Sequence, residues 1–243
     1  MIHRSALLLF GLSIFLASGC ARFRPAPAPL RTIALPSPEG DARCLVVLLP
    51  GRRDRPEDFV RHDFAGIASR AGIRADVVAV DAHLGYYYRQ TIVDRLREDV
   101  VAPARKRYDR IWLAGISLGG TGSILYTDAH PEDVDGIVLL APFLGEQEVI
   151  DEVAAAGGLR GWKAPETVGP DDFQRRMWRW LARSHGKLPL YLGYGTRDGF
   201  ARANGLLGEA LPPGRAVTAD GGHDWKTWRA LWEKVAESGG LCR

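Results

Sequence analysis

A serine, a histidine and an aspartate stand in this chain with the residue types and spacing that nucleophilic catalysis requires. Ser117 occupies the stretch Gly115-Ile116-Ser117-Leu118-Gly119, between the apolar run "RIWLA" and a helical pattern. A G-x-S-x-G pattern in that position holds the serine in a strained turn with its hydroxyl projecting, and side chains at the two glycines would collide with neighbouring backbone. The pattern predicts that Ser117 is a nucleophile.

A serine hydroxyl is a weak nucleophile near neutral pH and needs a base to accept its proton. His223 in "TADGGHDW" follows the last predicted strand and precedes the last predicted helix, which is where such a base would stand. His83 in "VDAHLGYYY" also follows a strand, and we interpret it as a wall of the site or a substrate contact. His223 is the predicted base.

The base needs an acid to fix its tautomer and to stabilise its charged form. Asp198 in "LYLGYGTRDGF" follows the penultimate predicted strand. Asp220 and Asp224 lie close to His223 in sequence, and neighbours in one turn rarely reach back to the ring. Asp198 is the predicted acid.

Two periodicities alternate along the chain and position these residues. Short Val, Leu and Ile runs predict strands covered on both faces, at residues 44–50, 75–82, 110–116, 136–142, 188–195 and 214–220. Helical patterns lie between them, at residues 58–70, 91–107, 118–128, 171–184, 201–211 and 225–237. The alternation predicts an α/β fold with a mainly parallel sheet and helices on both faces, and ligands of such sheets bind at the carboxyl ends of strands.

The order Ser117, Asp198, His223 on this alternating pattern resembles the α/β-hydrolase superfamily, from Cys44 to the last helix. The closing "GGHDWKTWRALW" further resembles the branch of esterase D and related carboxylesterases. The resemblance implies the α/β-hydrolase fold with a short lid insertion, a Ser-His-Asp triad and an acyl-enzyme route. It also implies an oxyanion hole in the turn "LPGR", where proline replaces the family's frequent histidine. Its expected donors are the backbone N–H groups of Arg52 and Leu118.

Several residues around the site are candidates for substrate contact. In the family, insertions at residues 143–187 form lids, and Trp162 in this segment either lines an acyl pocket or packs in the core. Trp178 and Trp180 recur at helical spacing and are predicted to pack. Tyr86, after a strand end, is a further candidate wall of the cleft. The arginines of "GRRDRPEDF" either form a solvated turn or bind an anionic substrate.

The first residues form a separate unit. Residues 1–19 have the basic start, apolar run and small-residue end of a signal peptide. "LASGC" resembles the bacterial lipobox, which makes Cys20 the expected lipidation site; cleavage without lipid is the alternative. Residues 20–40 are proline-rich and predict a tether, so that the hydrolase domain comprises residues 41–243. We therefore expect a lipoprotein facing the periplasm, or a secreted soluble protein.

The two remaining cysteines, Cys44 and Cys242, either form a disulfide or remain free. The charge of +3, from 32 Lys and Arg against 29 Asp and Glu, is spread without a basic block, so no nucleic-acid partner is indicated. No metal-ligand motif or dinucleotide loop appears, and cofactor-free chemistry is expected. The expected function is a serine hydrolase, specifically a carboxylesterase acting on a small ester. An acyltransferase, a peptidase or a non-catalytic binding lipoprotein are the alternatives.

Overall fold

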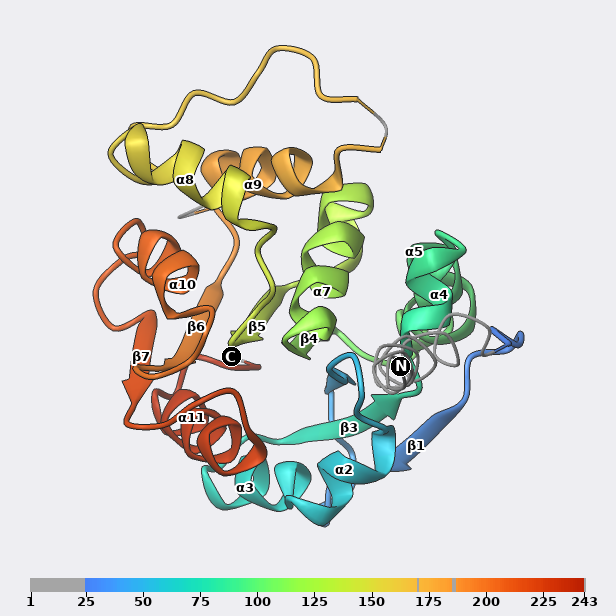
Figure 1. The fold of residues 1–243 in the computed structure, drawn as a ribbon. Helices are drawn as coiled ribbons and strands as arrows, with labels where there is room; N and C mark the ends of the chain where they lie inside the picture. Colours follow the sequence, from blue (N-terminus) through green and yellow to red (C-terminus); the bar gives the residue numbers. More distant parts are fainter. Residues whose placement is uncertain (1–24, 170, 185–186, 243) are drawn as a thin grey trace, which may run out of the picture.

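The fold is an open seven-stranded sheet with helices on both faces, as the sequence predicts. A computed structural model describes residues 25–169, 171–184 and 187–242 (Figure 1). The strand order is β1-β3-β2-β4-β5-β6-β7, with β1 antiparallel to β3 and all other neighbours parallel. The strands are β1 Thr32–Leu35, β2 Cys44–Leu49, β3 Ala75–Val80, β4 Arg110–Ile116, β5 Gly136–Leu140, β6 Leu190–Gly195 and β7 Ala216–Ala219.

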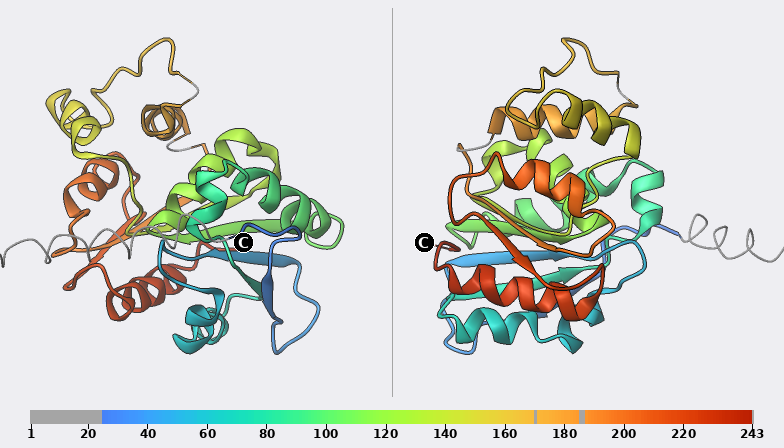
Figure 2. Two further views of the ribbon diagram at one scale, coloured as in Figure 1. Left: turned by 45° about the vertical axis from the view of Figure 1, so that its right-hand side comes forward. Right: turned by 60° about the vertical axis from the view of Figure 1, so that its left-hand side comes forward.

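The helices cover the sheet in two layers, which Figure 2 shows from two further sides. One layer consists of α2 Pro56–Arg61, α3 Phe64–Arg70 and α11 Trp225–Glu237. The other consists of α4 Leu84–Tyr88, α5 Ile92–Leu96, α7 Leu118–Ala129, α8 Gln147–Ala155, α9 Phe173–Ser184 and α10 Ala201–Gly208. In addition, α5 continues through the π-helical η1 Arg97–Val101 into α6 Ala102–Ala104, and the 3-10 turn η2 Pro131–Asp133 follows α7.

Each central strand contributes side chains to both layers of the core. Val46 and Val47 are adjacent and fully buried, yet they belong to the two different hydrophobic clusters. Successive side chains of a strand point to opposite faces, so a sheet covered twice needs uninterrupted apolar runs. This explains why the buried strands were recognisable in the sequence; all six predicted strands are present, including β7, which is partly exposed at the sheet edge.

Two predicted helices are interrupted, and two helices were not predicted. The pattern over residues 58–70 is divided into α2 and α3 because Asp63 adopts a left-handed conformation with φ of 57°. The pattern over 91–107 contains the π-helical turn at Arg97–Val101. The two helices that were not predicted are α4, formed by "LGYYY", and α8, within the insertion that follows β5.

The packed domain begins earlier than the predicted boundary at residue 41. Thr32–Leu35 pairs with β3, and Leu30 is buried in the core. The backbone N–H of Leu30 donates to Asp99, while the hydroxyl of Tyr86 donates to the carbonyl of Pro27. The later part of the predicted tether is therefore an edge strand with its own anchoring contacts.

The predicted signal peptide, residues 1–19, and the predicted lipidation site, Cys20, lie outside the described residues. Within the described ranges, no helix combines the length and apolar character needed to cross a membrane.

A disulfide joins the beginning of the core to the end of the chain. Cys44, the first residue of β2, is bonded to Cys242, with 5.7 Å between the Cα atoms. Of the two alternatives for these cysteines, the structure has the paired one. The bond holds the segment after α11 against the central strands.

Candidate active site

The turn between β4 and α7 places Ser117 at the carboxyl end of the central strand. Its backbone has φ of 52° and ψ of −113°, a region that non-glycine residues rarely occupy and that functional sites often retain. A Cβ atom on Gly115 would lie 2.2 Å from the carbonyl oxygen of Gly119, and one on Gly119 would lie 2.1 Å from that of Leu49. The two glycines therefore permit the close approach of backbones that this turn requires.

Ser117, His223 and Asp198 form a continuous hydrogen-bonded chain of side chains. His223 Nε2 lies 3.0 Å from Ser117 Oγ, and His223 Nδ1 lies 2.7 Å from Asp198 Oδ2. An ionised carboxylate only accepts hydrogen bonds, so the Nδ1 proton faces Asp198 and the lone pair of Nε2 faces the serine hydroxyl. The three residues that the sequence selected are brought together in the arrangement that proton removal from the serine needs.

The carboxylate of Asp198 is buried and has a hydrogen-bond partner at each of its two oxygens. Its side chain is 1% exposed, and its second oxygen, Oδ1, accepts the backbone N–H of Phe200 at 2.8 Å. The neighbouring candidates have other partners: Asp220 pairs with Arg197 at 3.0 Å on the surface, and Asp224 caps α11. The N–H of Thr227 donates to Asp224 and lowers the pKa of that carboxyl group.

Two phenylalanines that were not predicted as site residues lie near Ser117 and His223. The ring of Phe200 meets the ring of His223 edge to face at 4.9 Å, and the ring of Phe143 lies 5.6 Å from that of Phe200. The backbone N–H of Phe143 donates to the carbonyl of Ser117. Both follow the ends of strands, β5 and β6, so the same rule that selected Asp198 could have found them.

The turn after β2 lies close to the turn that carries Ser117. A Cβ atom on Gly51 would lie 3.6 Å from Cβ of Ser117, which shows how closely the two turns approach. Leu118 is the first residue of α7, so its N–H has no partner within the helix. Among the described residues, the N–H of Arg52 has no acceptor. The side chains of Arg52 and Arg53 are exposed.

The three predicted substrate contacts occupy packed positions. His83 is buried, and its Nδ1 accepts the N–H of Gly85 at the start of α4. Tyr86 is 1% exposed and its hydroxyl donates to Pro27. Trp162 is buried, and its indole N–H donates to Glu152 at 2.8 Å. All three side chains are therefore engaged in packing, and their contact with a substrate stays a prediction.

The segment predicted as a lid contains α8 and α9. Helix α9 packs against α7, and α8 packs against α10. Trp178 and Trp180 are buried, which confirms that they pack, and the indole N–H of Trp178 donates to the carbonyl of Leu144. A lid movement by this segment stays a prediction.

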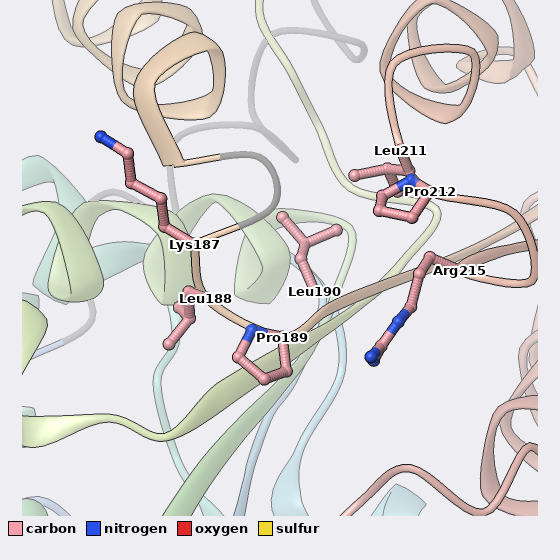
Figure 3. Close-up of a pocket in the computed structure, with 7 residues that line it drawn as sticks. All are labelled: Lys187, Leu188, Pro189, Leu190, Leu211, Pro212 and Arg215. Carbon is pink, nitrogen blue, oxygen red and sulfur yellow. The ribbon is translucent and has the colours of Figure 1, made fainter.

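A small pocket lies where the parallel strands begin, whereas Ser117 lies at their carboxyl ends. It adjoins the amino end of β6 and has a volume of about 190 Å³; its lining residues are Lys187, Leu188, Pro189, Leu190, Leu211, Pro212 and Arg215 (Figure 3). The two cationic groups point in different directions, and the Arg215 guanidinium stacks over the ring of Tyr191. The pocket therefore does not gather charges around one ligand.

Potential metal ligands come together within the described residues at His130, Glu132 and Asp133, near the far end of α7. The sequence analysis did not identify this group. Asp133 already accepts the hydroxyl of Tyr126 and pairs with Arg97, so its carboxylate is engaged. The group is separated from Ser117 by the length of α7.

Comparisons with solved structures relate the fold to known hydrolases. Est1E from Butyrivibrio proteoclasticus with bound ferulic acid is 18% identical, with a TM-score of 0.59 over 87% of this chain and 94% of that chain. S-formylglutathione hydrolase (FrmB) from Staphylococcus aureus is 14% identical, with a TM-score of 0.56 over 87% and 97%. The monoacylglycerol lipase of Paleococcus ferrophilus is 18% identical, with a TM-score of 0.54 over 86% and 99%. These similarities establish the fold.

The sequence comparisons place the chain in a family. A search of curated proteins gave no matching sequence. The family model described as serine aminopeptidase, S33, matches residues 58–198, which include the serine turn and end at Asp198. Because the match covers more than half of the chain and the fold agrees with it, this chain belongs to the serine aminopeptidase S33 family of α/β hydrolases.

Proposed function

We propose that the protein is a serine carboxylesterase in which Ser117 is the nucleophile, His223 the general base and Asp198 the residue that orients the base. The observation that carries the proposal is the unbroken chain from Ser117 Oγ through both nitrogens of His223 to Asp198. A binding lipoprotein would not require a serine in a strained turn, a histidine in contact with that serine and a buried carboxylate in contact with the histidine.

In the proposed reaction, Ser117 Oγ attacks the ester carbonyl carbon while His223 Nε2 takes the hydroxyl proton. The developing oxyanion accepts hydrogen bonds from the backbone N–H groups of Arg52 and Leu118. The same proton then goes from His223 to the departing alcohol oxygen, leaving an acyl-enzyme. Water, deprotonated by His223, attacks this acyl group, and transfer of the proton back to Ser117 releases the acid and restores the enzyme.

Two observations support esters of small, partly apolar acids as substrates. The aromatic ring of Phe200 lies against His223, and the ring of Phe143 lies beside that of Phe200. Three structural neighbours are Est1E with bound ferulic acid, an S-formylglutathione hydrolase and a monoacylglycerol lipase. At such identities these names guide the choice of test substrates.

Aminopeptidase activity is the second candidate, because the family description names it. Such an enzyme must bind the α-ammonium group of its substrate near the serine. Here the turn beside Ser117 carries three exposed arginines, Arg52, Arg53 and Arg55, against the one carboxylate of Asp54, and this net positive charge repels an ammonium group. The local charge therefore favours esters over peptides with a free amino terminus.

The test combines covalent labelling with substrate comparison. A fluorophosphonate should label the protein at Ser117, and Ser117→Ala should abolish both labelling and hydrolysis of short p-nitrophenyl esters. His223→Ala should reduce hydrolysis by orders of magnitude, and His83→Ala should retain it. Greater kcat/KM on aminoacyl p-nitroanilides than on esters would establish the peptidase instead. Absence of labelling and of both activities would leave a non-catalytic binding protein.

We also propose that the protein is exported and anchored by lipid at Cys20. The support is the apolar leader, the "LASGC" sequence and the proline-rich segment behind it. In bacterial cells the protein should incorporate radioactive palmitate and partition into detergent, and Cys20→Ala should lose both properties. Secretion of unlabelled, soluble wild-type protein would favour cleavage without lipid.

A further inference from the structure

A carboxylate outside the Ser-His-Asp chain connects the turn after β2 to the segment that carries the histidine. The backbone N–H of Asp54 donates to the carbonyl of Gly51 at 3.1 Å and closes the turn Gly51–Asp54. The side chain folds back onto the same turn, since a Cβ atom on Gly51 would lie 2.4 Å from Asp54 Oδ2. The Cβ atom added to Gly51 would also lie 3.6 Å from Cβ of Ser117. Gly51 is therefore held between Asp54 and the nucleophile.

The other oxygen of Asp54 accepts a hydrogen bond from the last helix. Trp225 Nε1 donates to Asp54 Oδ1 at 2.9 Å, across 171 positions of sequence. Trp225 is the first residue of α11 and stands two positions after His223. Its ring is fixed by a stacked contact with His62 at 4.6 Å and by an edge contact with Trp228 at 5.3 Å. Trp228 in turn meets the ring of His223 edge to face at 4.9 Å.

We infer that Asp54 is a positioning residue. Through its hydrogen bond to Trp225 it fixes the turn Gly51–Asp54 relative to the segment that carries His223. This inference rests on the proposed function, in which the N–H of Arg52 serves the oxyanion. Arg52 lies inside the turn that Asp54 closes, so a shift of Asp54 moves the backbone N–H group that the proposed function assigns to the oxyanion. Asp54 itself contacts neither the hydroxyl nor the imidazole.

The hydrogen bond should affect the chemical step more than substrate binding. Oxyanion donors stabilise charge that exists only in the transition state, so misplacing one lowers kcat and leaves KM nearly unchanged. Losing such a donor outright typically costs a factor of about 100 to 1,000 in kcat. A turn that is displaced but still present should lose less, and we expect about a tenfold decrease in kcat for Asp54→Ala.

Substitutions separate the hydrogen bond from the charge and from packing. Asp54→Asn keeps an acceptor oxygen for Trp225 and should retain kcat within about threefold of wild type. Trp225→Phe keeps most of the ring contacts and removes the N–H donor, and should match Asp54→Ala. Because both changes remove one contact, the double variant should be no slower than the slower single variant. Trp232→Phe, on the same helix as Trp225, is the control. It removes the indole hydrogen bond to the carbonyl of Phe64 and should lower stability without lowering kcat.

A spectroscopic measurement tests the linkage without relying on activity. In ¹⁵N-tryptophan-labelled protein, the Trp225 indole signal, assigned by its loss in Trp225→Phe, should be protected from solvent exchange. That protection should persist in Asp54→Asn and be lost in Asp54→Ala. Unchanged protection in Asp54→Ala would overturn the linkage, whatever the substrate proves to be. Intact linkage with normal kcat in Asp54→Ala would overturn the positioning role, as would an Asn variant as slow as the Ala variant. A wild-type protein inactive on every ester would instead count against the proposed function.

Discussion

Asp198 Oδ2 lies 2.7 Å from His223 Nδ1, although 25 residues separate the two in sequence. Because the backbone N–H of Phe200 holds the other oxygen of Asp198, the carboxylate cannot rotate freely. The imidazole ring is thereby fixed with Nε2 toward Ser117 at 3.0 Å. The arrangement of Ser117 and His223 thus depends on a buried carboxylate that makes no hydrogen bond to the serine.

Asp198→Asn should leave the fold intact and decrease kcat by about a thousandfold or more. The amide would place its NH₂ group toward Nδ1 and favour the tautomer that has its proton on Nε2, which cannot accept the serine proton. Steady-state hydrolysis of a short activated ester, corrected for the uncatalysed rate, measures the effect. Asp220→Asn is the matched control and should retain activity, since Asp220 pairs with Arg197 on the surface. A slow Asp220 variant beside a nearly normal Asp198 variant would reverse the assignment.

Gly119→Ala should be poorly tolerated at the serine turn. The added methyl group would lie 2.1 Å from the carbonyl oxygen of Leu49, and neither a Cβ atom nor a backbone carbonyl can rotate away. We expect a loss of stability of about 1–3 kcal/mol, as for overpacked sites, together with lower kcat. Gly205→Ala in α10 is the control, because the nearest atom to its new methyl would be 3.8 Å away. That change should be neutral or stabilising, by up to about 1 kcal/mol. Equal behaviour of the two variants in urea unfolding would contradict the steric argument.

The central strands and the Ser117 turn were predictable because each is encoded within a short stretch of sequence. Buried strands need continuous apolar runs, and the turn needs its two glycines. The edge strand β1 was missed because its four residues, "TIAL", lie between proline-rich stretches and are partly exposed. An edge strand needs little apolar character, so composition did not distinguish it from a tether.

Contacts between distant residues were less predictable. The proximity of Asp198 to His223 could be predicted because its place after a strand limited the alternatives. No local pattern distinguishes Asp54 from its neighbours in "GRRDRP", since its role depends on Trp225, 171 positions away. The pairing of Cys44 with Cys242 likewise depends on where α11 ends relative to β2. Such relationships arise from the packing of the layers and require the fold.

Removal of residues 25–40 should destabilise the domain. The truncation deletes β1, the buried Leu30 and the Arg31 side chain, which contacts both Glu57 and Asp81. Leu30→Ala in the longer chain should by itself cost about 2–3 kcal/mol, within the usual range for a buried leucine. Urea unfolding followed by circular dichroism compares chains that begin at residues 25 and 41. Equal midpoints would show that the first residues behave as the predicted tether.

Loss of the disulfide should lower stability while leaving the reacting groups in place. Removing a native disulfide typically costs about 2–5 kcal/mol, and this one closes a loop of 198 positions. Cys242→Ser should lower the urea midpoint and make stability insensitive to reductant, whereas wild-type protein should lose stability when reduced. Wild-type stability that is the same with and without reductant would show that the bond contributes nothing.

Asp224 should stabilise α11 in a manner that depends on pH. Its carboxylate accepts the N–H of Thr227 at 2.9 Å as the helix N-cap, and this bond lowers the pKa of Asp224 from its usual value of 3.8. Because the folded pKa lies below the unfolded one, the contribution is fully present above about pH 4 to 5 and is lost as pH falls through the folded pKa. Asp224→Ala should therefore cost about 1 kcal/mol at pH 7, in the range for N-caps, and less at pH 3. Asp224→Asn, which caps without titrating, should cost little at pH 7 and change little between the two conditions. Urea unfolding of the wild type and the two variants at both pH values measures these differences. If the alanine variant loses the same stability at pH 3 as at pH 7, the ionised carboxylate is not what stabilises the helix.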